Sequence, residues 1–140
     1  MIQEKSLPDI VKTIILQAPI LKVWDAVATS TNIAAWFMPN DFEPVLGHPF
    51  SIHSPYGVSP CKVTVIDPPY KLEFTWGPDW IITFQLKEGA DGTTEFTLTH
   101  GGWKENIHTE AGMSHAEVRN RMDNGWESAV LPRLRELVEA

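Results

Sequence analysis

The strongest pattern of apolar and polar positions lies at the C-terminal end of the chain, between Ser114 and Ala140. Apolar residues recur there every three or four positions, which predicts one long amphipathic helix with a buried face. The residues of this face are Val118, Met122, Trp126, Ala129, Val130, Leu134, Leu137 and Val138. Ser114 and Glu117 have the spacing of a capping box, so we expect the helix to begin at Ser114. Such a helix needs an apolar partner surface elsewhere in the chain.

Two residues inside the predicted helix are poor helix formers. Gly125 lowers helix stability by about 1 kcal/mol relative to alanine, so we expect that another segment approaches it closely or that the helix bends there. Pro132 removes one backbone hydrogen bond, which predicts a kink near residues 128–132. A bent helix would widen the space between itself and its partner surface.

Upstream of the helix, apolar and polar residues mostly alternate with period two, which predicts β-strands. One strand covers residues 9–18 and ends at Pro19, and two short helices follow over residues 21–28 and 30–37. From residue 47 to residue 100, short alternating runs are separated by turn residues. This arrangement predicts an antiparallel meander with one dry face, which the C-terminal helix covers.

The segment between the last predicted strand and the helix, residues 101–113, shows no periodicity. A loop of this length is uncommon inside a compact domain unless it serves a function. We therefore expect it to act as a lid or to form the mouth of a site.

Length and composition are those of one globular domain over residues 1–140, with 43% hydrophobic and 21% charged residues. The formal charge of −7 argues against nucleic acid and anionic membrane surfaces as partners, since both bind clustered lysine and arginine. No apolar run approaches the roughly 20 residues of a membrane span, and the first residues lack the layout of a secretory signal. Cys61 is the only cysteine, which excludes an intrachain disulfide and favours a cytoplasmic location.

Short motifs occur along the chain in the order and at about the spacings of one known family. They are Ala18-Pro19 with Val23-Trp24, Trp36-Phe37, Gly47 with Phe50, Asp67-Pro68-Pro69 with Leu72, Gly92-Thr93, Thr97-Leu98-Thr99-His100 and Gly125-Trp126. Over residues 9–139 the chain resembles the homologues of the heat-shock ATPase activator (Aha-like proteins), within the START-like (SRPBCC) superfamily. The resemblance implies an α+β helix-grip fold: a curved antiparallel sheet wraps around a long C-terminal helix, and two short helices follow the first strand. It also implies a deep cavity between that helix and the sheet.

The inward faces assigned by alternation are rich in aromatic residues, as the lining of an apolar ligand pocket would be. The predicted ligand-binding residues are Phe50, Trp76, Trp80, Phe84, His100, Trp103, Met122 and Trp126. Aromatic residues are equally expected in a plain helix-on-sheet core, where Trp24 and Leu98 are placed, because they fill volume. The sequence leaves both interpretations open.

His100 is the most informative polar residue, because alternation from Phe96 and Leu98 turns it inward at the end of the last strand. It could donate a hydrogen bond to a ligand carbonyl, act as a general acid or base, or be a core histidine that hydrogen-bonds the backbone. A metal site of His100 with His108 and His115 is not expected, because spacings of eight and seven residues match no ligand motif.

Other chemistry is poorly represented in the sequence. Cys61 lies on an inward strand face with no basic neighbour, which predicts a buried, inert thiol. Ser54 and Thr94 also face inward and could offer a hydroxyl to a ligand or to the backbone. The chain has no serine-hydrolase, Cys–His or phosphate-binding glycine motif, so we expect neither a cofactor nor a metal.

These observations predict a cytoplasmic protein that binds a small hydrophobic molecule, aromatic or lipid-like, and favour binding over catalysis. One alternative is an enzyme resembling polyketide cyclases or dehydratases, with His100 as its catalytic residue. A second alternative, implied by the resemblance, is a co-chaperone module that stimulates a heat-shock ATPase, although we expect this chain to lack the activator's second, partner-binding domain. The identity of the ligand and the oligomeric state stay open.

Overall fold

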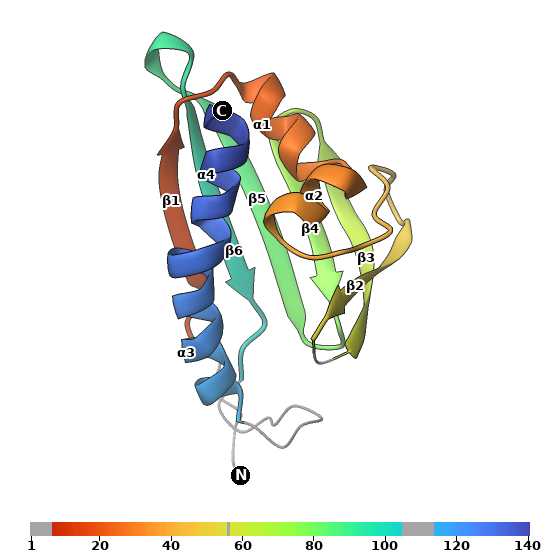
Figure 1. The fold of residues 1–140 in the computed structure, drawn as a ribbon. Helices are drawn as coiled ribbons and strands as arrows, with labels where there is room; N and C mark the ends of the chain where they lie inside the picture. Colours follow the sequence, from red (N-terminus) through yellow and green to blue (C-terminus); the bar gives the residue numbers. More distant parts are fainter. Residues whose placement is uncertain (1–6, 56, 105–113) are drawn as a thin grey trace.

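The computed structural model describes residues 7–55, 57–104 and 114–140, which form one antiparallel sheet with helices packed on one of its faces (Figure 1). The strands are β1 (Ile10–Leu16), β2 (Pro49–Ser54), β3 (Gly57–Asp67), β4 (Lys71–Trp76), β5 (Trp80–Glu88) and β6 (Thr94–Gly101). The helices are α1 (Ile20–Val27), α2 (Ser30–Trp36), α3 (His115–Gly125) and α4 (Leu131–Glu139). A 3-10 turn covers Ala90–Gly92, and a π-helical turn covers Trp126–Val130 between α3 and α4. The order of elements confirms the predicted α+β helix-grip fold.

The sheet is six-stranded, in the order β1-β6-β5-β4-β3-β2, and every neighbouring pair is antiparallel. The predicted meander therefore runs from β2 to β6, and β1 joins its far side. This topology makes β6 an interior strand. On it, His100 lies opposite Ile10 of β1 and Ile82 of β5. The backbone that carries His100 is thus held by strands on both sides.

The core lies between the sheet and the helices, and alternate strand residues enter it as the period-two pattern predicts. The sheet contributes Phe50, Ile52, Cys61, Val63, Leu72, Phe74, Trp76, Ile82, Phe84, Leu86, Phe96 and Leu98, all at most 5% exposed. The helices contribute Ile20, Val23, Val27, Ile33, Trp36, Val118, Trp126, Leu131, Leu134 and Val138. Leu98 is a core residue as predicted, whereas Trp24 is only partly buried at the edge of the core.

The C-terminal helix is continuous from His115 to Glu139 but changes its winding at the π-helical turn. Ser114 caps the helix as predicted: its Oγ accepts a hydrogen bond of 3.2 Å from the N–H of Glu117. In the π turn, the N–H of Leu131 donates to the carbonyl of Trp126, five residues earlier. This wider winding lets Trp126 and Leu131 both face the core, where they are 2% and 4% exposed.

The structure corrects two expectations about this helix. A Cβ added at Gly125 would meet no atom within 4 Å, so the prediction of a close approach is wrong for the described part of the chain. The kink expected near residues 128–132 is instead the π turn, which ends two residues before Pro132. Pro132 lies in the first turn of α4, where a missing N–H is well tolerated.

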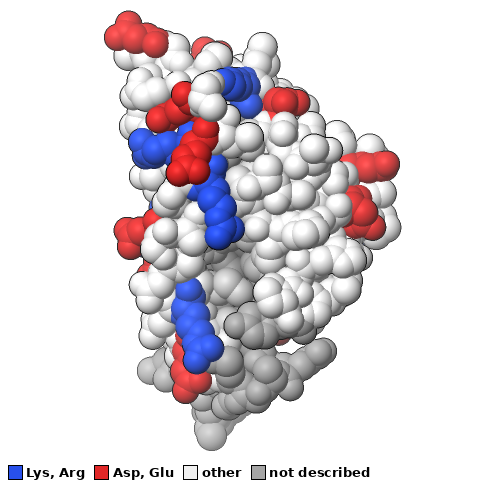
Figure 2. Space-filling model, viewed as in Figure 1, with Lys and Arg blue, Asp and Glu red and all other residues white. Residues whose placement is uncertain are grey.

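Charged residues are unevenly spread over the helical face of the molecule. Figure 2 shows lysine and arginine side chains in a column along the C-terminal helix, with acidic side chains among them. The surface beside this column carries fewer charged side chains (Figure 2). Leu21 of α1 is 70% exposed. Across the described residues, no helix has both the length and the apolar character needed to cross a membrane.

Candidate functional site

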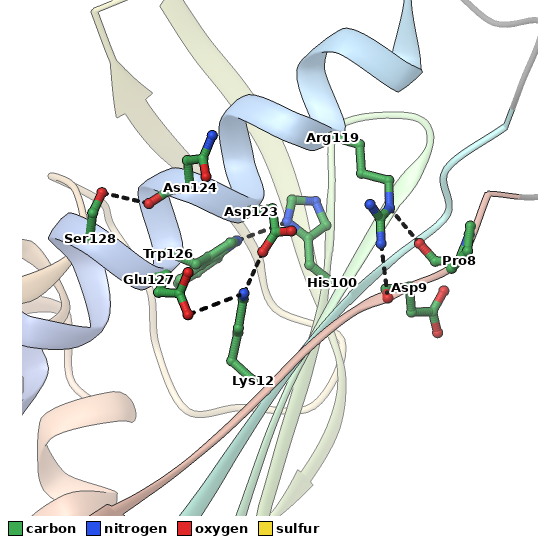
Figure 3. Close-up of polar contacts among 10 residues, drawn as sticks. All are labelled: Pro8, Asp9, Lys12, His100, Arg119, Asp123, Asn124, Trp126, Glu127 and Ser128. Carbon is green, nitrogen blue, oxygen red and sulfur yellow. Dashed lines mark hydrogen bonds and ion pairs between the residues drawn. The ribbon is translucent and has the colours of Figure 1, made fainter.

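His100 lies at the centre of the candidate site. Strand β6 places its side chain inside the fold, where it is 0% exposed. The indole Nε1–H of Trp126, from the π turn, donates to the imidazole Nδ1 at 3.1 Å (Figure 3). The indole Nε1–H of Trp103 donates to the backbone carbonyl of His100 at 2.9 Å. Two tryptophans from different segments therefore hold this residue in place.

These contacts determine the protonation state of His100. An indole nitrogen can only donate, so Nδ1 is the unprotonated acceptor and the neutral ring carries its proton on Nε2. Burial, and to a smaller extent the positive charge of Arg119, lowers the pKa of His100 from 6.5 to about 3. At neutral pH the imidazole is therefore an uncharged hydrogen-bond donor through Nε2.

Polar contacts tie the helix that carries the indole donor to the N-terminal strand (Figure 3). Lys12 on β1 forms an ion pair with Asp123 of α3, with Nζ and Oδ1 2.5 Å apart. One turn earlier, the guanidinium of Arg119 donates to the backbone carbonyls of Pro8, at 2.6 Å, and Asp9, at 3.4 Å. These contacts fix the end of α3 over β1 and so position the π turn above His100.

Four tryptophans surround the imidazole, and with it they form what we call the His100 cluster: His100, Trp76, Trp80, Trp103 and Trp126. The distance between ring centroids is 5.6 Å from the imidazole to Trp76 and 5.3 Å to Trp80. It is 4.6 Å to Trp103 and 6.2 Å to Trp126. Trp76 and Trp80 face each other across the β4–β5 pair, with centroids 5.3 Å apart. The structure thus brings together five of the predicted ligand-binding residues, from β4, β5, β6, the segment after β6 and the π turn.

The His100 cluster contains N–H groups without hydrogen-bond partners. Within residues 7–55, 57–104 and 114–140, nothing pairs with the buried Nε1 atoms of Trp76 and Trp80 or with Nε2 of His100. Given the tautomer of His100, all of these groups are donors. A buried donor left unpaired lowers stability by about 1–3 kcal/mol, so such groups are uncommon and ask for an explanation.

The other predicted ligand-binding residues lie outside the His100 cluster. Phe50 and Phe84 contact Phe74, with ring centroids 5.3 and 5.9 Å apart, and belong to the aromatic core. Met122 is partly buried against the same core. For these three residues the structure supports the interpretation as core packing.

The two grooves that we describe lie outside the space expected between helix and sheet. Two surface grooves of about 430 and 420 Å³ are present, one on the outer face of the sheet and one between β1 and the C-terminal helix. None of the predicted ligand-binding residues lines either groove. The open cavity therefore stays a prediction, and at the His100 cluster the aromatic rings that were predicted to line it pack against one another.

His115 is buried beside the His100 cluster, a position that the sequence pattern was not used to predict. It is 1% exposed, and its ring centroid lies 5.7 Å from that of Trp103. Its Nδ1 accepts a hydrogen bond of 3.2 Å from the N–H of Lys104, and its Nε2 lies 3.8 Å from Oδ2 of Asp79. The position of His115 three residues before Val118, on the apolar face of the helix, is the signal that could have predicted its burial.

Two expectations concern residues that the structure describes only in part. The predicted lid over residues 101–113 is described as far as Lys104, and residues 105–113, which include His108, lie outside the described residues. In the part of the chain that is described, no three His, Cys, Asp or Glu side chains gather as they would around a metal ion.

The smaller polar candidates have structural partners. Cys61 is 5% exposed, and burial raises the pKa of its thiol to about 12, which confirms the prediction of a buried thiol. The Thr94 hydroxyl donates to the carbonyl of Ala18 at 2.7 Å, and the Ser54 hydroxyl donates to the carbonyl of Gly57 at 3.2 Å. Both hydroxyls therefore bond the backbone.

The chain forms a six-stranded antiparallel sheet packed against a long C-terminal helix, with a buried aromatic site beneath that helix. This combination defines a START-like protein of the SRPBCC type. The family model described as activator of Hsp90 ATPase homolog 1-like protein matches residues 17–139. The chain belongs to this family, which confirms the resemblance seen in its sequence.

Solved structures agree with this assignment. The chain is 48% identical to a Bacillus halodurans protein, with a TM-score of 0.86 over 95% of this chain and 98% of that one. It is 20% identical to the Aha1 protein from Colwellia psychrerythraea, solved as a dimer, with a TM-score of 0.78 over 95% and 97% of the two chains. An Hsp90 activator from Plasmodium falciparum is 17% identical, with a TM-score of 0.77 over 94% and 96%. The last two likenesses show the fold alone. A comparison with curated proteins finds no match.

Proposed function

We propose that this protein binds a small hydrophobic molecule, aromatic or lipid-like, at the His100 cluster. The observation that carries the proposal is the gathering of four tryptophans around a neutral, buried histidine, with N–H groups unpaired among the described residues. A core that serves stability alone pairs its buried donors, because each unpaired one lowers the free energy of unfolding. A ligand that reaches these donors would remove that loss.

The indole faces would supply most of the binding free energy, at about 25 cal/mol per Å² of apolar surface removed from water. The N–H groups would orient the ligand. Since the rings of the site pack against one another in the described structure, the ligand must separate them as it enters. Trp80 is only partly buried, so we expect entry beside it, where β5 begins.

The cyclase or dehydratase alternative would need His100 to take up a proton during turnover. Its pKa of about 3 and the hydrogen bond that Nδ1 already accepts from Trp126 both oppose this role. The imidazole is better suited to orient a bound molecule. We therefore propose binding and not catalysis.

A titration followed through the indole N–H signals in ¹⁵N–¹H NMR spectra tests the proposal, with 2-acetonaphthone as the probe. The indole signals of the His100 cluster are expected to shift together and to saturate. Trp36 is an internal control, because its Nε1–H already donates to the carbonyl of Ala26, at 2.9 Å. Absence of saturable shifts in the cluster, across probes of different size, would remove the proposal.

Family membership favours a second candidate function, contact with a heat-shock ATPase. Leu21 of α1, which is 70% exposed, marks the surface that we assign to such a partner. An ATPase assay with purified Hsp90 tests this candidate, using Leu21→Glu as the variant. Stimulation that is lost in the variant supports it, and no stimulation by the wild-type chain excludes it.

A further inference from the structure

We infer that the molecule bound at the His100 cluster is an aromatic carboxylate, and that its carboxylate group accepts hydrogen bonds from Trp76, Trp80 and His100. The inference rests on the proposed function and narrows its ligand to one chemical class. It follows from the kind of polar group that the cluster leaves unpaired and from the number of these groups.

The unpaired groups of the cluster are all donors. The Nε1 atoms of Trp76 and Trp80 carry hydrogen and have no lone pair to offer. Nε2 of His100 carries the imidazole proton, because Nδ1 accepts from Trp126. Their rings are in mutual contact, with centroid distances of 5.3 Å between Trp76 and Trp80, 5.6 Å between Trp76 and His100, and 5.3 Å between Trp80 and His100. A ligand that satisfies these groups must therefore present hydrogen-bond acceptors to them.

The number of donors favours a carboxylate over a single carbonyl. A carbonyl oxygen accepts two hydrogen bonds and would leave one of the three N–H groups unpaired. A carboxylate offers about four acceptor positions on two oxygens, so it can serve all three donors. Hydrogen bonds to an ionised acceptor are also roughly twice as strong as those between neutral groups.

Charged groups of both signs lie near the cluster. None of the five residues of the His100 cluster is acidic, and the nearby Asp123 is paired with Lys12. Arg119 acts on His100 from α3 as a positive charge, which is the second cause of the low pKa of the imidazole. Asp79 faces His115 on the other side of Trp80 and Trp103. Acidic groups are close as well: a Cβ added at Gly101, the residue after His100, would lie 2.8 Å from Oδ1 of Asp9. The choice of a carboxylate therefore rests on the kind and number of the donors, and the surrounding charges do not decide it.

The test compares 2-naphthoate with 2-acetonaphthone, which has the same ring system but a single neutral carbonyl. Binding to the full chain is measured by the indole N–H shifts at pH 7. We expect 2-naphthoate to bind about tenfold more tightly or better, since its acceptor is charged. We expect the Trp76 and Trp80 indole protons to move downfield with it, while the Trp36 signal stays in place.

Trp80→Phe keeps an aromatic ring but removes one donor, and Trp24→Phe makes the same change outside the cluster. Trp80→Phe is expected to lower the affinity for 2-naphthoate at least about fivefold and that for 2-acetonaphthone by less than about twofold. Trp24→Phe is expected to change neither affinity. Trp76→Phe serves as the second variant, and each variant's fold is checked by its NMR spectrum.

Each outcome of this test bears on one of the two proposals. Equal affinity for the two probes would overturn the carboxylate assignment and leave the proposed function standing. Equal weakening of both probes by Trp80→Phe would overturn the role of its N–H. If neither probe binds, the proposed function fails together with the inference.

Discussion

Lowering the pH from 7 to 5 is expected to destabilise the folded protein through His100. The imidazole is buried as a neutral donor with a pKa of about 3, whereas the same group in the unfolded chain has a pKa of 6.5. Between these two values the unfolded state binds more protons than the folded state, so the free energy of unfolding falls as the pH falls. The full contribution is present above pH 6.5 and is lost progressively down to pH 3.

The size of the effect follows from the two pKa values. At pH 5 the unfolded imidazole is almost fully protonated and the folded one is not, so the linkage amounts to about 2 kcal/mol between pH 7 and pH 5. That is a substantial part of the stability of an ordinary domain. Urea unfolding followed by circular dichroism at pH 5, 6 and 7 measures it directly.

Two histidine variants separate this contribution from other titrations. His100→Gln removes the titrating group and is expected to flatten the dependence between pH 5 and pH 7, although the variant is less stable overall. His53→Gln makes the same change at an exposed position on β2 and is expected to keep the wild-type slope. A His100→Gln protein with the wild-type slope would refute the reasoning.

The remaining predictions concern the helix and the thiol. Gly125→Ala is expected to raise the free energy of unfolding by up to about 1 kcal/mol, because the position is helical and a methyl group meets open space; a lower urea midpoint would contradict this. Leu134→Ala, at a fully buried position of α4, is expected to lower the free energy of unfolding by about 2–5 kcal/mol in the same assay. Leu21→Ala, at a position that is 70% exposed, is expected to change this free energy little. The pKa of the Cys61 thiol is raised to about 12, so we expect the thiol to react with Ellman's reagent far more slowly in the folded protein than in urea. A rapid reaction without urea would show that the thiol is accessible.

The sequence predicted the elements whose side chains obey one period. The strand residues Phe74 and Trp76 alternate with polar neighbours because one face of the sheet is wet, and that regularity is visible without coordinates. The same regularity turned His100 inward. Of the four tryptophans around it, Trp76 and Trp80 follow from strand alternation and Trp126 from the helical period, whereas Trp103 follows from neither.

The features that the sequence did not predict depend on contacts between segments that are distant in the chain. The π turn buries Leu131 five residues after Trp126, a spacing that a 3.6-residue period does not contain. The pairing of an indole N–H with Nδ1 of His100, which fixes the tautomer, joins a strand to a helix. The packing of the aromatic rings against one another is a matter of volume, and periodicity carries no information about volume.

The π turn gives the C-terminal helix one surplus residue, and this has a consequence for how the family can vary. Loss of a single residue between positions 126 and 130 would restore uniform α-helical winding and rotate one half of the helix against the other. Either Trp126 would swing away from the imidazole, or Leu134 and Val138 would leave the core. Changes of length in related chains should therefore collect in surface connections such as the 3-10 turn at Ala90–Gly92, and avoid this turn of the helix.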